Sequence, residues 1–180
     1  PPGSVWKAIT MLAALENHVV KPDTKLQVGA GISLGGFFFG DWTKTSGLFD
    51  LVKCLAWSRD SAFYQMALHM TPEMIKEWGV KFGAGRPTGL ELRHEGNGLV
   101  PDSEWKERVC HEKWYPGNTL HMSIGQTYVQ LTPAQGARIY AGLGNRGRVP
   151  DMHFVIKIGD RQIPPPKPEM VRTHKEYLDV

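Results

Sequence analysis

The chain has 180 residues, which is room for one domain of ordinary size with a buried core. With 41% hydrophobic and 22% charged residues, its composition excludes a disordered chain and a coiled coil. No apolar run is long enough to span a membrane, and the net charge of +3 does not indicate the basic face that nucleic-acid binding requires.

The first predicted element is an apolar helix that follows Gly3-Ser4 and extends to about Asn17. Its apolar residues recur at helical spacing, and its polar residues are so few that most of its sides should be buried. The glycine-rich segment 21–47 predicts loops and short strands. Residues 48–57 predict a short apolar helix.

A further helix is predicted over residues 60–70, and Thr71-Pro72 caps another that ends near Lys81. Residues 83–118 lack periodicity and are rich in turn residues, which predicts loops. The capping box Thr132-Pro133-Ala134-Gln135 opens a helix that should end at Gly142.

The C-terminal region has a predicted strand near residues 154–158, and Pro164-Pro165-Pro166 predicts a stiff linker. Residues 168–180 resemble a helix without a C-terminal cap, and the chain begins without an initiator methionine. We therefore expect the sequence to be an excerpt from a longer protein.

The two cysteines, Cys54 and Cys110, could form one disulfide but show no pattern of a metal or redox site. Cys54 lies in the apolar run 51–57, which favours a buried free thiol.

Ser4-Val5-Trp6-Lys7 is the first pattern that indicates chemistry. A serine in the first turn of a helix and a lysine three residues later lie on one helix face. The amino end of a helix stabilises an oxyanion and favours the neutral form of a nearby lysine, which can then remove the serine proton. On its own, an N-cap serine with a solvated lysine explains so short a pattern better.

The longer context changes this interpretation. Pro1-Pro2-Gly3-Ser4-Val5-Trp6-Lys7 resembles the active-serine motif of penicillin-binding transpeptidases, and residues 57–65 resemble their second motif, Ser-x-Asn or Ser-x-Asp, followed by an aromatic-Gln helix start. Up to about Phe154 the chain is similar to elongation-type class B penicillin-binding proteins, the penicillin-binding protein 2 group. Further matching segments follow in the order of that family: 82–92, 95–96, 101, 105–106, 114–119, 123–126 and 131–135.

The resemblance implies an α/β (α+β) fold of the penicillin-binding and serine β-lactamase type. In this fold a five-stranded antiparallel sheet with flanking helices lies beside a helical lobe, and the serine is at their junction. We expect residues 1–180 to be an incomplete transpeptidase domain that holds most of the helical lobe and the active-serine helix, with part of the sheet missing. Without that sheet the first helix should expose an apolar patch that binds a hydrophobic dye or drives self-association.

The resemblance also implies a serine-type D-Ala-D-Ala transpeptidase that cross-links peptidoglycan stem peptides and is acylated by β-lactam antibiotics. Carried over by position, Ser4 would be the acyl nucleophile and Lys7 the general base. Ser58 would relay a proton between Lys7 and the departing or attacking amine, and Asp60 would hydrogen-bond Lys7 and the substrate peptide. Without this context, Ser58-Arg59-Asp60 would be interpreted as a helix N-cap.

The third motif of the family, Lys-Thr-Gly or Lys-Ser-Gly, has no match after Gln135. Lys44-Thr45-Ser46-Gly47 has an extra residue and lies between the first two motifs, so we interpret it as a glycine turn. In the family the backbone after the third motif supplies part of the oxyanion hole, and one lost donor costs about a hundredfold to a thousandfold in rate. The chain alone should therefore be nearly inactive, even where its parent is an enzyme.

Two other functions remain open. A serine β-lactamase shares the first motif but must activate water for deacylation, and residues 105–135 are more similar to the transpeptidases. A β-lactam sensor or a degenerate penicillin-binding module would be acylated without turnover. The four retained site residues argue against degeneracy, whereas the absent third motif leaves it open.

No cofactor is expected. Some relatives carry a zinc site of Asp, His and Cys between the first two motifs, and Asp41 could be a remnant of it. Residues 20–58 contain no histidine and only Cys54, which is too few ligands for a tetrahedral site. The histidines further along the chain are interpreted as surface or core residues: His94, His111 and His121.

Members of this family have one amino-terminal transmembrane helix and act on the outer side of the bacterial plasma membrane, beside a glycan polymerase. The resemblance therefore implies membrane contact only through an anchor outside this sequence. It implies stem peptides, β-lactams, a glycan polymerase and cell-elongation proteins as partners, and no nucleic acid.

Overall fold

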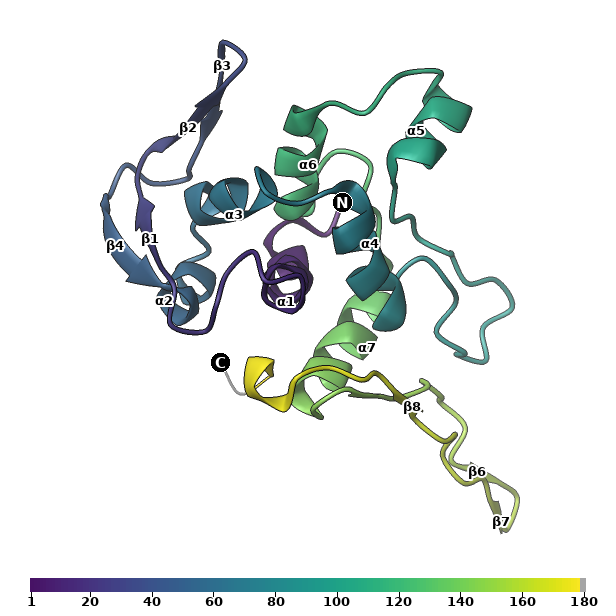
Figure 1. Cartoon of the computed structure of the whole chain (residues 1–180). Coiled ribbons are helices and arrows are strands. Elements are labelled where there is room, and N and C mark those ends of the chain that lie inside the picture. The colour runs from purple at the N-terminus through teal and green to yellow at the C-terminus, as the bar shows by residue number, and fades with distance from the viewer. Residues whose placement is uncertain (179–180) are drawn as a thin grey trace.

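The computed structural model describes residues 1–178. At its centre, the 3₁₀ turn η1 (Gly3–Trp6) leads directly into helix α1 (Lys7–Glu16). Figure 1 shows α1 surrounded by the other helices of the chain. These are α2 (Leu51–Ala56), α3 (Asp60–Ala67), α4 (Pro72–Lys81), α6 (Pro116–Ser123) and α7 (Pro133–Gly144), with α5 (Ser103–Cys110) further out.

The strands of the described residues form antiparallel pairs rather than one sheet. Two hairpin-like pairs project from the helices in Figure 1, β2–β3 at one end and β6–β7 at the other. The mixture of helices and a partial sheet agrees with the predicted fold class, and the five-stranded sheet is not formed within residues 1–178. The pairs are β1 (Lys25–Val28) with β4 (Gly47–Asp50), β2 (Gly31–Leu34) with β3 (Phe37–Gly40), β5 (Arg148–Val149) with β8 (Glu169–Met170), and β6 (Lys157–Ile158) with β7 (Arg161–Gln162).

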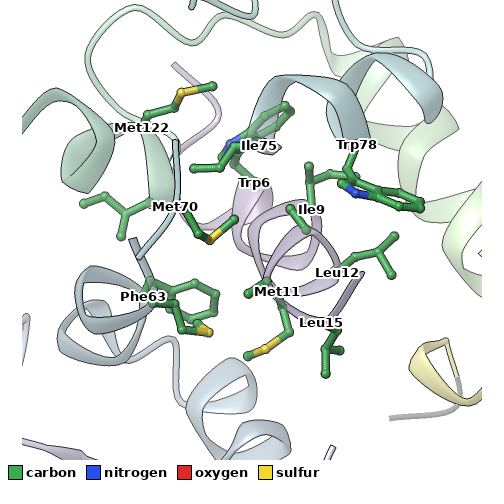
Figure 2. Packing of buried hydrophobic residues seen from close by; sticks show 14 of the residues in the cluster. Trp6, Ile9, Met11, Leu12, Leu15, Phe63, Met70, Ile75, Trp78 and Met122 are labelled. Atoms are coloured by element: carbon green, nitrogen blue, oxygen red, sulfur yellow. The ribbon is translucent and has the colours of Figure 1, made fainter. Parts of the chain in front are cut away.

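Helix α1 is buried on most of its sides, as its sequence predicts. Figure 2 shows Trp6 and Ile9 packed near Ile75 and Trp78 of α4, while Phe63 of α3 lies near Met11. The segment forms a helix because Ala, Leu and Met are strong helix formers. It has few polar residues, so no face of the helix needs to be exposed to water. The central position of α1 fixes where both ends of the helix lie in the molecule.

Trp6 fits only because Gly79 has no side chain. The Trp6 side chain is fully buried, and a Cβ at position 79 would lie 2.3 Å from its Cη2 atom. Since an indole ring is rigid, this contact makes the spacing between η1 and α4 depend on a glycine in the last turn of α4.

We expect Gly79→Ala to lower the free energy of unfolding by about 1–2 kcal/mol, because the clash with Trp6 outweighs the gain in helix propensity. Gly136→Ala in α7 is the matched control, since a Cβ there meets no atom within 4 Å. The control should raise stability by about 0.5–1 kcal/mol. Urea unfolding measures both, and equal stabilisation of the two variants would contradict the packing argument.

Three predicted elements differ in the structure. Residues 48–57 are not one helix, because residues 48–50 pair with β1 and α2 begins only after Asp50, whose carboxylate accepts a hydrogen bond from Lys53 N at 2.7 Å. The prediction of loops over 83–118 is wrong at α5 and at the start of α6. Helix α5 is polar and buries only Lys106, so it has no periodic apolar face for the sequence to reveal.

The capped helices are confirmed. Thr71 Oγ1 accepts a hydrogen bond from Met74 N at the start of α4, and Thr132 and Gln135 form the capping box of α7. Helix α7 continues to Gly144, two residues beyond the predicted end.

The C-terminal predictions are partly wrong. Of the predicted strand 154–158 only Lys157–Ile158 is a strand, and the helix predicted over 168–180 is replaced by β8 and the 3₁₀ turn η2 (Lys175–Tyr177). Pairing of β8 with β5 and the hydrogen bond from Val171 N to Gly147 O hold this segment extended. The last two residues of the predicted helix, 179 and 180, lie outside the described residues.

The large apolar patch expected on α1 is reduced to a groove. Residues 9–15 of α1 are buried within the described chain. What remains is a groove of about 400 Å³ between α1, α2 and α7, lined among others by Leu55, Tyr140 and Leu143. The C-terminal residues Tyr177 and Leu178 pack at this groove and cover part of the surface that was expected to be open.

Both cysteines are free thiols. Cys54 is a buried residue of α2, and this burial raises the pKa of its thiol to about 11. Cys110, at the end of α5, is partly exposed.

At pH 8 we therefore expect iodoacetamide to alkylate Cys110 in the native protein and to leave Cys54 unmodified, because only about one Cys54 thiol in a thousand is ionised at that pH. Peptide mass spectrometry after timed quenching measures both sites. In urea both thiols should react, and native labelling of Cys54 at the rate of Cys110 would show that the thiol is not protected.

Candidate active site

The structure brings the four predicted site residues together. Ser4 lies in η1, Lys7 is the first residue of α1, Ser58 lies in the turn between α2 and α3, and Asp60 is the first residue of α3. The ammonium Nζ of Lys7 donates hydrogen bonds to the Ser58 carbonyl oxygen at 2.8 Å, to Ser58 Oγ at 2.8 Å and to Asp60 Oδ1 at 2.5 Å.

Ser58 connects this lysine to Ser4. The hydroxyl of Ser58 donates to Ser4 Oγ at 2.8 Å, so the four polar groups form one continuous chain of hydrogen bonds. Within residues 1–178 no direct hydrogen bond joins Lys7 to Ser4. Ser58 Oγ lies between the two groups, since it contacts both Ser4 Oγ and Lys7 Nζ, and the Lys7 side chain also reaches Asp60.

The four hydrogen-bonded residues differ sharply in burial. Lys7 is 1% exposed, whereas Ser4 is an exposed residue at the surface. An ammonium group has three donors and no acceptor, and here three acceptors receive them. The Phe63 ring, with its centroid 5.2 Å from Lys7 Nζ, also faces the charge. The buried Lys7 ammonium is thus fully partnered, while the Ser4 hydroxyl is open to a ligand.

The turn that carries Ser4 is held by the loop after α6. Gly3 N donates to Gly125 O at 2.9 Å, and Thr10 Oγ1 of α1 donates to Ser123 O at 2.8 Å. Gly125 has φ +70°, and a Cβ there would lie 2.2 Å from the carbonyl oxygen of Gly3. The N–H of Ser4 lies in the first turn, where no intrahelical acceptor exists, and it can therefore face an oxyanion.

A buried ion pair fixes the turn that carries Ser58. Arg59 Nε lies 3.2 Å from Asp41 Oδ2, with both side chains fully buried, and Asp41 Oδ2 also accepts from Ser61 N at 2.8 Å. Arg59 Nη2 donates to the carbonyl oxygens of Gly29 and Thr45 at 3.0 and 2.7 Å. Asp41 thus has a structural partner.

The N-cap interpretation of Ser58-Arg59-Asp60 does not hold, because the residue before α3 is Arg59 and no side chain caps it. Ser58 itself has φ +50°, in the left-handed region that non-glycine residues rarely adopt. That backbone conformation places both the hydroxyl and the carbonyl oxygen of Ser58 against Lys7.

Two carboxylates act on the neighbouring tyrosine. Burial first, and then the charges of Asp60 and Asp41, raise the pKa of Tyr64 to about 12. The phenol is therefore neutral at physiological pH.

The remaining candidates lie elsewhere. His94 and His111 are exposed, His121 is half-buried against the Phe39 ring, and Ser46 is exposed in the loop before β4. No group of three or more His, Cys, Asp or Glu side chains in the described part of the chain could hold a metal ion. None of the described helices is both long and apolar enough to cross a membrane.

Comparison with known proteins shows the family. The sequence profile of the penicillin binding protein transpeptidase domain matches residues 1–179. The chain belongs to this transpeptidase family. It is 35% identical over 159 residues to the peptidoglycan D,D-transpeptidase MrdA of Salmonella typhimurium, which covers 87% of this chain and 26% of that protein.

Solved structures agree. A chain in a peptidoglycan synthase complex described as coordinating polymerization and crosslinking superposes with a TM-score of 0.90 and 32% identity, covering 98% of this chain and 31% of that one. Penicillin-binding protein 2 of Helicobacter pylori, in its complex with MreC, gives a TM-score of 0.84 and 33% identity over 91% of this chain and 30% of that one. The chain thus spans about a quarter to a third of the length of these transpeptidases.

Sequence reasoning missed the residues that position the transpeptidase motifs. The sequence offers Asp41 only as a possible metal ligand, and Arg59 only as the residue between Ser58 and Asp60. Neither has a local pattern, because the two lie 18 positions apart and meet only in the folded chain. Gly125 was part of a matched motif, but only coordinates show its contact with Gly3.

We expect Asp41→Asn to lower the free energy of unfolding by about 3 kcal/mol, because it leaves the Arg59 guanidinium buried without its counter-charge. Glu77→Gln is the matched control, since it removes an exposed ion pair with Lys81 and should change stability by no more than about 0.5 kcal/mol. Urea unfolding of both variants checks this. Two equal, small losses would show that the Asp41–Arg59 pair does not hold the turn.

Proposed function

We propose that the protein containing this chain is a serine D,D-transpeptidase that cross-links peptidoglycan stem peptides through an acyl-enzyme on Ser4. The observation that supports the proposal is the continuous hydrogen-bonded chain from exposed Ser4 through Ser58 to buried Lys7 and Asp60. A hydroxyl needs such a proton acceptor to become a nucleophile at neutral pH.

The first half-reaction transfers the donor peptide to Ser4. With Lys7 in its neutral form, the Ser4 proton passes to Ser58 Oγ while the Ser58 proton passes to Lys7 Nζ. Ser4 Oγ then attacks the carbonyl carbon of the penultimate D-Ala, and the oxyanion forms near the Ser4 N–H. As the C–N bond breaks, the departing amine of the terminal D-Ala takes a proton back along Lys7 and Ser58.

The second half-reaction is the reverse transfer to another amine. The acceptor amine forms a C–N bond with the acyl carbon while the bond to Ser4 Oγ breaks, and Ser4 recovers a proton. Asp60 stays an anion throughout and orients the Lys7 amine toward Ser58, which limits the movement that each proton transfer needs.

Proposals about partners rest on two similar proteins. Because a similar penicillin-binding protein 2 forms a complex with MreC, and another similar chain belongs to a peptidoglycan synthase complex, we infer a glycan polymerase and cell-elongation proteins as partners here. β-Lactams would acylate Ser4 as stem peptides do. The site would act on the outer side of the bacterial plasma membrane, with the anchor and the Lys-Thr-Gly or Lys-Ser-Gly motif in the remainder of the protein.

Fluorescent penicillin tests the proposal in the full-length protein. Ser4→Ala should abolish covalent labelling, because no other group on the chain of hydrogen bonds replaces the nucleophile. Ser46→Ala is the matched control, since this exposed serine belongs to Lys44-Thr45-Ser46-Gly47 and should leave labelling unchanged. Labelling of Ser4→Ala at the unmodified rate, measured on denaturing gels, would refute the assignment of Ser4.

The same labelled protein separates the alternatives. A stable label fits a transpeptidase or a β-lactam sensor, and release of the label within seconds would indicate a serine β-lactamase. Adding an acceptor stem peptide to the enzyme acylated by a peptide donor then distinguishes the first two. A transpeptidase forms the cross-linked peptide, and a sensor does not.

A further inference from the structure

A cavity of about 400 Å³ lies beside the hydrogen-bonded residues Ser4, Ser58, Lys7 and Asp60, and Asp60 is part of its wall. Its walls come from the β2–β3 hairpin, from α3 and α6, and from the loop after α6. Figure 1 shows this hairpin projecting from the body of the molecule. Gln126 and Ile124 in the loop wall flank Gly125, whose carbonyl oxygen holds Gly3. The cavity therefore borders the turn that carries Ser4.

Asp60 lines the cavity and also accepts the hydrogen bond from Lys7. Its Oδ1 atom accepts from Lys7, while its Oδ2 atom accepts no hydrogen bond from residues 1–178. Among the described residues that line the cavity, Asp60 is the one carboxylate and none is a lysine or arginine. The Lys7 ammonium offsets this negative charge in the free protein, whereas in the acyl-enzyme, where Lys7 is neutral in the proposed mechanism, the charge of the cavity wall is complementary to a cation.

The other walls suit a cation on an aliphatic stem. The Phe39 ring packs against His121 and Tyr64, with ring centroids 5.2 and 5.9 Å apart. Phe37 and Phe38 are 74% and 65% exposed at the rim, although large apolar side chains are usually covered. Aromatic faces attract ammonium groups and pack against methylene chains.

We propose that this cavity binds the primary ammonium group of the acceptor peptide, with the charge at Asp60 Oδ2 and the aliphatic stem against the phenylalanines. The inference rests on the proposed transpeptidase function and adds to it the place where the second substrate is held. The bound ammonium gives one proton to neutral Lys7. The free amine then forms the C–N bond as the acyl bond to Ser4 Oγ breaks, and its second proton returns to Ser4. Lys7 releases its proton to water.

The test uses the full-length protein acylated by a peptide thioester, with Nα-acetyl-D-lysine as the acceptor. The acceptor dependence of the ratio of aminolysis to hydrolysis is measured by chromatography. Because both products come from the same acyl-enzyme, the ratio does not depend on how fast Ser4 is acylated.

Gln126 is exposed in the cavity wall, so its charge can be changed with little effect on folding. Gln126→Lys should raise the half-saturating acceptor concentration about fivefold to tenfold by repelling the ammonium, and Gln126→Glu should lower it about twofold to fivefold. Gln130→Lys on the same loop, exposed but outside the cavity, should shift it less than about twofold.

A neutral acceptor completes the design. The control acceptor is Nα-acetyl-6-hydroxynorleucine, an uncharged alcohol of the same shape. With this acceptor, the ratio of alcoholysis to hydrolysis should be the same in Gln126→Lys and in Gln126→Glu. Equal values for the amine in both variants, or equal charge effects on amine and alcohol, would overturn the proposed ammonium site. A wild-type protein that forms no acyl-enzyme at all would instead overturn the transpeptidase function on which the site depends.

Discussion

An ammonium group almost out of contact with water is the constraint on which the site depends. Lys7 is 1% exposed, and leaving a buried charge without partners costs several kcal/mol. Its three acceptors all come from Ser58 and Asp60, more than fifty positions further along the chain. If the start of α1 and the start of α3 moved apart, Lys7 would lose its acceptors and the free energy of folding would become less favourable by that amount. The geometry of the site therefore depends on how these two helices pack.

A second buried ion pair, Arg59–Asp41, completes this arrangement. Here the cation lies in the turn before α3 and the carboxylate lies earlier in the chain, whereas in the Lys7–Asp60 pair the cation comes first. The turn before α3 sends Ser58 and Asp60 toward Lys7 and sends Arg59, between them, toward Asp41. Each buried cation thus faces a carboxylate from another segment, and the Asp41 carboxylate also accepts from the first turn of α3. These two ion pairs hold the short turn before α3 from both sides. The turn can therefore present both Ser58 and Asp60 to Lys7.

The sequence predicts what is local and misses what is assembled over distance. The Thr-Pro caps of α4 and α7 are complete within four residues, so both helices are predicted correctly. Helix α5 lacks an apolar stripe, and the extended segment that begins at Glu169 depends on pairing with β5, so neither could be inferred from periodicity. The four site residues are predicted from family motifs, whereas the position of Ser58 between Ser4 and Lys7 follows only from the folded chain.

The left-handed backbone of Ser58 is a local cost that the surrounding structure must offset. A serine at φ +50° is disfavoured by about 1–2 kcal/mol, and such strain persists only where the environment leaves no alternative. Relaxing it would remove the Ser58 carbonyl and hydroxyl from Lys7, and the turn is anchored next door by Arg59. The two hydrogen bonds that Ser58 accepts from Lys7 in this conformation offset its local cost. This coupling keeps the hydrogen bonds from Ser4 through Ser58 to Lys7 formed in the free protein, which is the preorganisation that the proposed acyl transfer would require.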